Sequence, residues 1–423
     1  MIDISLLREN PQIIEETLRK RNISLNLREI ILLDEEKRKL QKEIDNLRHK
    51  KSILSKGQTE EARGIKEEIK KREKEFKIKK EEFEKKFKLI PNIPLTDVPE
   101  GKSDKENIVL REVGKKPEFD FQPKDYLSLS EKLSLIDIKR AAKVSGSRFG
   151  YLKGLLASLE FALISFAFSL LLDKKFIREV IEEKKLDLTD KPFLPIIPPV
   201  MIRPEMMAKM GYLSWHPEEV YFLKDDDLCL VGTSEQSIGP MFANEILKEE
   251  DLPLRFLSFS TCFRREAGSY GKDTKGILRV HQFDKLEMFS FASPEKSILE
   301  HQLFLSLEEK MMEKLSLPYR VVRICSGDLS IPSASSYDIE TWLPGQNEGQ
   351  GEYRETHSTS NCTDYQARSL NIRFSDKKNK KRFIHTINGT AFALGRMIIA
   401  IIENYQKKDG TIEIPGALKK FII

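Results

Sequence analysis

The sequence predicts an α+β protein in which an antiparallel helical hairpin precedes a larger domain with a mainly antiparallel sheet flanked by helices. Residues 30–90 repeat apolar side chains every seven positions, as coiled coils do. Beyond residue 126, short runs with strand-like alternation are interspersed with helical patterns. The length, 423 residues, is too great for one ordinary domain.

The hairpin is predicted from two series of apolar residues with a break between them. The break falls near residues 55–59, and Pro91 ends the second series. Two helices of similar length joined by a short turn form an antiparallel pair. The positions that carry the repeat are Leu33, Leu40, Leu47 and Leu54, then Ile69, Phe76, Phe83 and Ile90.

Positive charge is concentrated in this hairpin. Residues 34–90 contain 20 Lys/Arg and 14 Asp/Glu, an excess that exceeds the net charge of +5 for the whole chain. Such a local excess predicts a polyanionic partner there. The alternative is a plain dimerisation rod.

We expect a helical domain at 1–100 with the arm at about 30–90, a linker rich in Pro, Gly and charge at 101–125, and a catalytic domain at 126–423. Residues 155–172 are mostly apolar over a length that just reaches a membrane span, but they contain Glu160, which favours a buried helix. Strands are predicted near 196–202, 219–224, 228–232, 256–263, 277–291, 319–325 and 336–343, and helices near 161–184, 235–248, 296–315 and 390–405.

Composition excludes other classes of site and compartment. The four cysteines are far apart and form no Cys-x-x-Cys pair, so we expect neither a disulfide framework nor a structural zinc. The first residues carry acids and no long apolar stretch, so no export signal is predicted. Both observations favour the cytoplasm.

The most informative stretch is 263–289. Arg264 and Glu266 lie two positions apart and would share one face of a strand; Phe283, Lys285 and Glu287 repeat this spacing after a Gly-rich loop. A guanidinium, carboxylates and a flat ring on one sheet face suit a ligand that has phosphate, an amine and a stacking base. The alternative is an amphipathic hairpin with a solvated charged face.

Two further groups could bind anions or amines. Residues 388–390, Asn-Gly-Thr, predict a turn and helix start whose N–H groups favour anions, and Arg396 follows on an apolar helix where it must be paired or bind a ligand. Thr233, Ser234 and Glu235 offer a carboxylate for an ammonium group, although Ser/Thr followed by Glu is also a common helix start. An interior salt bridge is the alternative for Arg396.

The order Phe-Arg-x-Glu, Gly-rich loop, Arg-x-His-Gln-Phe-x-Lys-x-Glu at 263–287 closely resembles motif 2 of class II aminoacyl-tRNA synthetases, in its seryl-tRNA synthetase version. Residues 388–396 resemble motif 3, residues 191–202 motif 1, and residues 353–362 the Tyr-Arg-Glu-x-x-Ser-x-Ser-Asn strand of that family. The resemblance spans nearly the whole chain and is of the bacterial type. It implies a class II synthetase catalytic domain behind a tRNA-binding coiled-coil arm.

By this resemblance the chain activates L-serine with ATP and Mg²⁺ to seryl-adenylate and transfers serine to the 3′ end of tRNA(Ser), and of tRNA(Sec) where that is present. The resemblance also implies a homodimer formed through motif 1 near Pro199, and no membrane association. Two alternatives stay open: a related enzyme that charges another acceptor such as a carrier protein, and a non-enzymatic RNA-binding scaffold.

The resemblance also implies residue roles. Glu235 reads the serine ammonium and Glu287 its hydroxyl. We expect His281 to be an orienting or buried polar residue rather than a base. Arg264, Arg396 and Glu355 are the catalytic residues, with Glu355 and Ser358 near Mg²⁺. The serine contacts are Thr233, Ser234, Glu235, Arg264, Glu287, Asn388 and Thr390. The ATP contacts are Arg264, Arg265, Glu266, Arg279, Val280, Phe283, Glu355, Thr356, His357, Ser358 and Arg396.

The chain departs from the family pattern at several places. Residues 210–215, Met-Gly-Tyr-Leu-Ser-Trp, replace a Gly-Thr-Gly-Gln-Leu-Pro-like stretch. Pro192 stands where motif 1 commonly has glycine, and His357 stands at a usual serine position. The segment 346–352 is about four residues longer than is usual. We expect these differences to alter loop geometry and kinetics without removing a phosphate- or serine-binding group.

Overall fold

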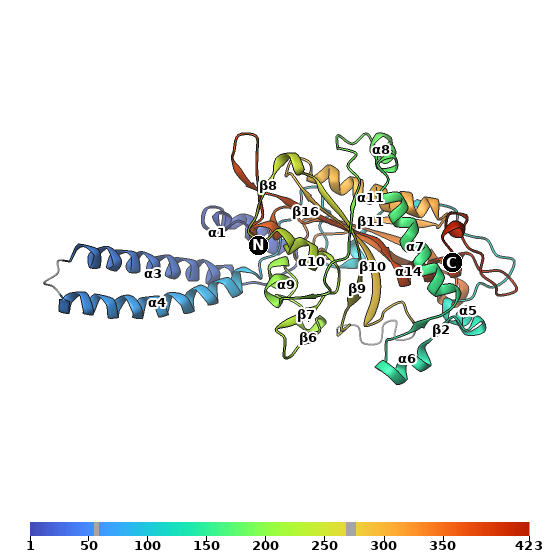
Figure 1. Ribbon diagram of the computed structural model, residues 1–423, viewed down its shortest axis with the longest axis horizontal. Coiled ribbons are helices and arrows are strands. Elements are labelled where there is room, and N and C mark those ends of the chain that lie inside the picture. Colours follow the sequence, from blue (N-terminus) through green and yellow to red (C-terminus); the bar gives the residue numbers. More distant parts are fainter. Residues whose placement is uncertain (55–58, 268–275, 423) are drawn as a thin grey trace. The chain divides into compact units, whose positions relative to one another are not determined.

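The computed structural model describes residues 1–54, 59–267 and 276–422, which form two compact units, Met1–Ile93 and Pro94–Ile423 (Figure 1). The turn predicted near 55–59 lies outside the described residues except for its last position. So does most of the Gly-rich loop that precedes residue 276.

The first unit contains two short helices, α1 (Ile4–Glu9) and α2 (Pro11–Lys20), and two long ones, α3 (Leu27–Ile53) and α4 (Thr59–Phe87). The long helices lie side by side as a hairpin (Figure 1). Leu33, Ile69 and Phe83 from the predicted seam are buried, which confirms the coiled-coil prediction. Asp34 is also buried; Arg8 and Lys37 overcome the desolvation of its carboxylate and lower its pKa to about 2.

The second unit is built on one eight-stranded sheet that confirms the mainly antiparallel prediction. Among the described strands of this sheet, only the edge strand β4 runs parallel to its neighbour. The strands follow in the spatial order β1 (Ile108–Val113), β11 (Tyr319–Arg323), β12 (Ser335–Leu343), β13 (Glu352–Asn361), β16 (His385–Ala393), β10 (Gln282–Ala292), β9 (Leu254–Phe263) and β4 (Leu194–Ile196).

Helices and three small sheets surround this sheet. The small sheets contain β2 (Ile136–Asp137) with β3 (Tyr151–Leu152), β5 (Met201–Ile202) with β7 (Leu228–Leu230) and β6 (Phe222–Leu223), and β15 (Lys381–Phe383) with β14 (Arg373–Ser375) and β8 (Ile246–Lys248). The helices are α5 (Tyr126–Leu133), α6 (Ile138–Ser145), α7 (Leu155–Leu171), α8 (Lys174–Glu183), α9 (Pro204–Met210), α10 (Glu235–Ile238), α11 (Ser297–Lys314), α12 (Gln346–Gly349), α13 (Tyr365–Leu370) and α14 (Leu394–Asn404).

The apolar helix α7 belongs to the main core. Leu159, Leu163 and Phe166 pack with residues of α11, α14 and the central strands. Glu160, which the sequence left without a partner, shares a hydrogen bond with Asp284, and burial raises its pKa to about 8. Among the described residues no single helix is long and apolar enough to cross a bilayer, although α7 and α8 together, bent by 69°, have the length and composition of a broken span.

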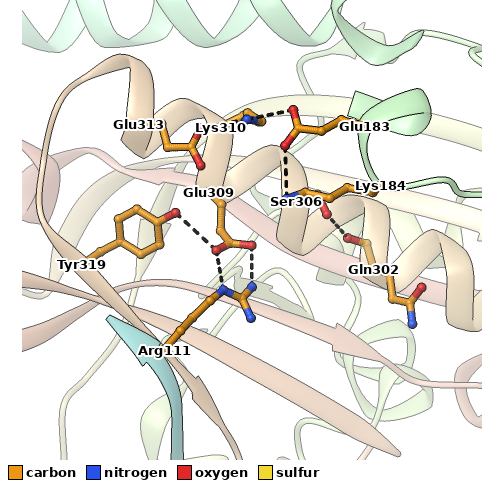
Figure 2. A network of polar contacts seen from close by, with 9 residues as sticks. All are labelled: Arg111, Glu183, Lys184, Gln302, Ser306, Glu309, Lys310, Glu313 and Tyr319. Carbon is orange, nitrogen blue, oxygen red and sulfur yellow. Dashed lines mark hydrogen bonds and ion pairs between the residues drawn. The ribbon is translucent and has the colours of Figure 1, made fainter. Parts of the chain in front are cut away.

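Helix α11 packs against β13 and β16, and Gly389 permits the close approach. A Cβ at Gly389 would lie 2.9 Å from a carboxylate oxygen of Glu308 and 3.1 Å from Phe304. Polar contacts also hold α11 through the buried Glu309: Arg111 of β1 donates two hydrogen bonds to it, and Tyr319 of β11 donates a third (Figure 2). The core helix is thereby tied to the far edge of the sheet.

Several predicted boundaries were wrong. The predicted linker 101–125 includes β1, which pairs with β11 as an integral strand. The helix predicted at 235–248 ends at Ile238, because Gly239 and Pro240 start a 3₁₀ turn instead. The four cysteines are buried and form no disulfide.

A buried ion pair connects β9 to α11 in this unit. Arg255 donates two hydrogen bonds to Glu300 at 2.6 and 2.8 Å, and both side chains are fully buried. The third guanidinium nitrogen, Nη1, donates hydrogen bonds to the carbonyl oxygens of Thr189 and Lys191.

We therefore predict that Arg255→Met lowers the free energy of unfolding by about 3–5 kcal/mol, because it leaves a buried carboxylate uncompensated. The double variant Arg255→Met/Glu300→Leu should lose less. Urea unfolding followed by the fluorescence of Trp215 and Trp342 measures both. The control is Lys115→Met, which removes an ion pair with Glu118 in which both side chains are exposed, and should change little. A double variant with a lower free energy of unfolding than the single variant would contradict the prediction.

Candidate functional site

The floor of the candidate site is formed by β10 and β16. Phe283, Lys285 and Glu287 alternate along β10 and therefore share one face, as predicted. Glu287 stands directly opposite Thr390 across the strand pair, just after a bulge in the register. Because neighbouring Gly389 faces α11, Thr390 and Glu287 face the opposite side of the sheet.

One lysine compensates the acids of this floor. The Lys285 Nζ lies 2.5 Å from the Glu287 Oε2, and the two side chains are 9% and 3% exposed. Burial raises the pKa of Glu287, and this effect is opposed by Lys285, Arg264 and the hydroxyl of Thr390. The sequence indicated Lys285 as part of the face but gave it no role.

A second carboxylate, Glu235, begins α10 beside this floor. Its Oε1 accepts a hydrogen bond from the Tyr212 hydroxyl. Its Oε2 and the Oγ1 of Thr233 are buried and have no hydrogen-bond partner among the described residues. Burial and the charge of Glu287 raise the pKa of Glu235 to about 7, against the effects of Lys285 and Tyr212. Two unsatisfied acceptors thus lie where the sequence predicted an ammonium site.

Two other residues predicted to contact serine, Ser234 and Asn388, have partners within the protein. The Ser234 hydroxyl lies 2.6 Å from that of Ser258 and is fully buried. Asn388 is buried, and its amide contacts Cys362 Sγ at 3.7 Å. The turn predicted at 388–390 is wrong, since these residues lie inside β16 and the helix begins only at Leu394. The glycine there serves the approach of α11 rather than a turn.

The cationic side begins where β9 ends. Arg264 follows the last strand residue; its Nε donates to the Gly232 carbonyl at 3.2 Å, and its guanidinium carbon lies 5.2 Å from the Phe283 ring centroid. His281 contacts the Arg264 carbonyl through Nδ1 at 3.0 Å. Arg265 stacks against Tyr221 at 5.9 Å.

The prediction that Arg264 and Glu266 share a strand face is wrong. The strand stops at Phe263, and Glu266 has a φ of 52°, which turns the chain. Glu266 nonetheless reaches Arg279, whose Nη1 lies 3.2 Å from its Oε2. Val280, next to Arg279, is buried in the core cluster.

Arg396 lies in the first turn of α14, as predicted. Its Nη1 donates to the Glu355 carbonyl at 2.9 Å and lies 3.3 Å from the Glu355 carboxylate. A pocket of ≈ 110 Å³ opens between Leu278, Arg279, Arg354, Glu355 and Arg396. The charges of Arg396 and then Arg264 lower the pKa of the half-exposed Glu355 carboxyl group. Two arginines distant in the chain therefore act on one carboxylate.

The rest of β13 is mostly internal. Thr356 and His357 are buried, which leaves only their main chain available to a ligand; burial lowers the pKa of His357 to about 3, so it is neutral. Ser358 faces Asp338 across the strand pair. Burial and the charge of Glu355 raise the pKa of Asp338. Within the described ranges, no three His, Cys, Asp or Glu side chains form a cluster that could hold a metal alone.

Three residues at the site had no role in the sequence prediction. Arg354 lines the pocket beside Arg396, Lys285 pairs with Glu287, and Tyr212 bonds to Glu235. Arg354 and Lys285 stand within stretches that the sequence had already marked. Tyr212 stands in a segment marked only as a departure, so no pattern pointed to its contact.

Two models of known protein families match this chain. A family model described as the seryl-tRNA synthetase N-terminal domain matches residues 1–94. A second, described as the tRNA synthetase class II core domain (G, H, P, S and T), matches residues 221–405. Both models fall within the regions that the sequence assigned to an arm and a catalytic domain.

Full-length relatives agree with the family models. The serine–tRNA ligase of Hydrogenobaculum sp. (strain Y04AAS1) is 42% identical, covering 100% of this chain and 99% of that protein. That of Dictyoglomus turgidum is 43% identical, covering 100% and 98%. Among solved structures, seryl-tRNA synthetase from Pyrococcus horikoshii complexed with ATP is similar with a TM-score of 0.85 at 38% identity, covering 100% of this chain and 98% of that one.

Proposed function

Because the chain belongs to the seryl-tRNA synthetase family, we propose that the site described above activates L-serine and passes it to tRNA(Ser). The reaction is serine–tRNA ligation, an aminoacyl-tRNA synthetase activity. The serine carboxylate attacks the α-phosphate of ATP and displaces diphosphate; the seryl group then moves to the 3′-terminal ribose of tRNA. The observation that supports this assignment best is the pocket in which Arg279, Arg354 and Arg396 surround Glu355, with Arg396 3.3 Å from its carboxylate.

The arginines supply the chemistry of the first step. No protein nucleophile is needed, because the serine carboxylate itself attacks. The site has to hold two anions together and stabilise charge that develops in line. Arg264 serves the α-phosphate and the serine carboxylate, and Arg396 and Arg279 serve the γ-phosphate of a bent ATP. Phe283, which already lies under the Arg264 guanidinium, offers its ring to the adenine.

Serine itself fits the acidic floor. Glu235 offers its unsatisfied Oε2 to the ammonium, with Thr233 beside it. Glu287 and Thr390 stand opposite each other. The Glu287 carboxylate accepts a hydrogen bond from the serine side-chain hydroxyl, and the Thr390 hydroxyl can donate one to it or accept one from it. A floor built for a hydroxyl leaves polar groups unpaired when alanine binds, which disfavours alanine.

The oxygens of Glu355 and Ser358 fit Mg²⁺ as a partner of the ATP phosphates. Glu355 is held ionised, and hard cations bind through one or two carboxylates plus substrate phosphates. Bound there, Mg²⁺ supplies charge neutralisation at the phosphates. Asp338, across from Ser358, provides a further carboxyl oxygen nearby.

We further propose a homodimer, a cytoplasmic location and tRNA binding by the arm, including tRNA(Sec) where present. Strand β4 is a sheet edge, and Leu194, Ile197 and Met201 around Pro199 expose large apolar surface, Ile197 to 82%. In the arm, Lys42, Lys70 and Lys74 are exposed and form no ion pair within the part of the chain that the structure describes. Such lysines suit RNA phosphates.

Serine-dependent ATP–pyrophosphate exchange, run with each of the twenty amino acids, tests the activity. Exchange that depends on serine supports it, and the absence of any serine response contradicts it. Charging of purified tRNA then separates this function from transfer to a carrier protein.

We predict that Arg264→Ala and Arg396→Ala each lower the rate of this exchange by at least ~100-fold, because each removes a cation aimed at developing charge. Steady-state kinetics measure the loss. The control is Arg382→Ala, which removes an ion pair with Glu295 remote from these groups. Near-normal exchange in either variant would remove that arginine from the mechanism.

For Glu287→Ala we expect a higher KM for serine and a preference for serine over alanine reduced by about 10- to 100-fold, since the acceptor for the hydroxyl is lost. Exchange kinetics with both amino acids provide the measurement. Glu295→Ala, an acid outside the floor, is the control. Selectivity equal to that of the unaltered protein would dismiss the assignment.

Replacing residues 34–90 by a short turn should spare serine-dependent exchange but lower tRNA charging by at least ~100-fold, because the positive excess is lost. Parallel exchange and charging assays measure the two effects on the same preparation. Efficient charging by the shortened protein would refute the role of the arm.

A further inference from the structure

Tyr212 is joined to the ammonium site by a contact that the family pattern does not supply. It lies two positions after α9, within residues 210–215, where this chain departs from the usual Gly-Thr-Gly-Gln-Leu-Pro-like stretch. Gly211 has a φ of 98° and turns the chain out of α9, so that the next side chain points inward. The Tyr212 hydroxyl then donates a hydrogen bond to Oε1 of Glu235.

The ring of Tyr212 is held by its surroundings. It packs against two apolar clusters, one containing Met210, Ile238 and Phe289 and the other Met207 and Val231. Its main-chain N–H also donates to the Met207 carbonyl at 3.3 Å. A phenol fixed on both faces presents its hydroxyl in one place, as a positioning group requires.

Glu235 needs such a group because its environment is mixed. Glu287 of β10 repels its charge, while Lys285 of the same strand and Arg264 favour it; the thiol of Cys362 is the other ionisable neighbour. Oε2 has no hydrogen-bond partner in the described part of the chain, whereas Oε1 has Tyr212. The two oxygens of the carboxylate are therefore differentiated before any ligand arrives.

We propose that Tyr212 is a positioning residue for serine binding: its hydroxyl occupies Oε1 of Glu235, holds the carboxylate ionised and directs Oε2 to the substrate ammonium. This inference rests on the proposed function, since the ammonium is that of serine. It assigns to the departing segment a part in substrate recognition.

The pH dependence of serine binding follows from this arrangement. The pKa of Glu235 is about 7 with the hydrogen bond in place. A hydrogen bond to the carboxylate favours the ionised form, so removal of the donor raises that pKa further. At neutral pH a larger fraction of Glu235 would then be protonated and unable to pair with an ammonium. Raising the pH ionises the carboxyl again and restores binding.

The test is Tyr212→Phe in the full-length protein, assayed by serine-dependent ATP–pyrophosphate exchange. At pH 7 we expect the KM for serine to rise about tenfold, with kcat and the KM for ATP within about twofold of the unaltered protein. At about pH 8.5 the difference in the KM for serine should shrink severalfold. The matched control is Tyr405→Phe. It removes a 2.7 Å hydrogen bond from the Tyr405 hydroxyl to the Leu315 carbonyl, which lies outside the site, and should leave all three constants unchanged.

A second variant distinguishes a hydrogen bond from packing. Glu235→Gln has no charge to hold, so adding Tyr212→Phe to it should not raise the KM for serine further. An equal rise in both backgrounds, an unchanged KM in the single variant, or a rise that is the same at both pH values would overturn the positioning role. If the unaltered protein shows no serine-dependent exchange at all, it is the proposed function that fails.

Discussion

The buried acids of the site depend on one ammonium group, that of Lys285. It pairs with Glu287 at 2.5 Å, and its charge also opposes the effect of burial on the pKa of Glu235. A carboxylate taken out of water otherwise neutralises by gaining a proton. Without this lysine, burial and mutual repulsion would leave the floor protonated and unable to bind an amine. In the proposed function, the ammonium group of serine would add a second compensating charge in the same place.

The architecture explains how one lysine side chain can serve two buried acids, Glu235 and Glu287. The central strand β16 packs on α11 through Gly389, which fixes the opposite face as the floor. The bulge between Leu286 and Glu287 sets Glu287 against Thr390 in the register of the strand pair. Glu235 arrives from a separate short helix and Glu355 from β13. Close contact between elements far apart in the chain thus creates the local charge balance.

The sequence predicted the arm, the antiparallel sheet and most of the charged residues, because heptads, strand alternation and motif spacing are local properties. It was wrong where tertiary packing decides: Gly389 serves the approach of a helix rather than a turn, and Glu266 leaves the strand through a positive φ. It marked Lys285 on the face of Glu287 without giving it a role, and it gave none to Tyr212, because the contact with Glu235 becomes apparent only when the segment after α9 meets the start of α10. A single sequence carries no periodic signal for such contacts.

The arginines of the site are already paired with acids to which the family resemblance gives ligand roles. Arg279 lies 3.2 Å from Glu266, and Arg396 lies 3.3 Å from Glu355. If ATP draws Arg279 toward a phosphate and offers its adenine amine to Glu266, both partners of the old pair gain new ones in a single event. An exchange of partners avoids leaving either charge desolvated and unpaired, which would be the costly outcome. Three guanidinium groups around one carboxylate in the pocket then leave a net positive field for a polyanion. Phosphate recognition and adenine recognition would therefore be coupled through the Arg279–Glu266 ion pair. A triphosphate without a base would give a new partner only to Arg279, and a base without phosphates would give one only to Glu266.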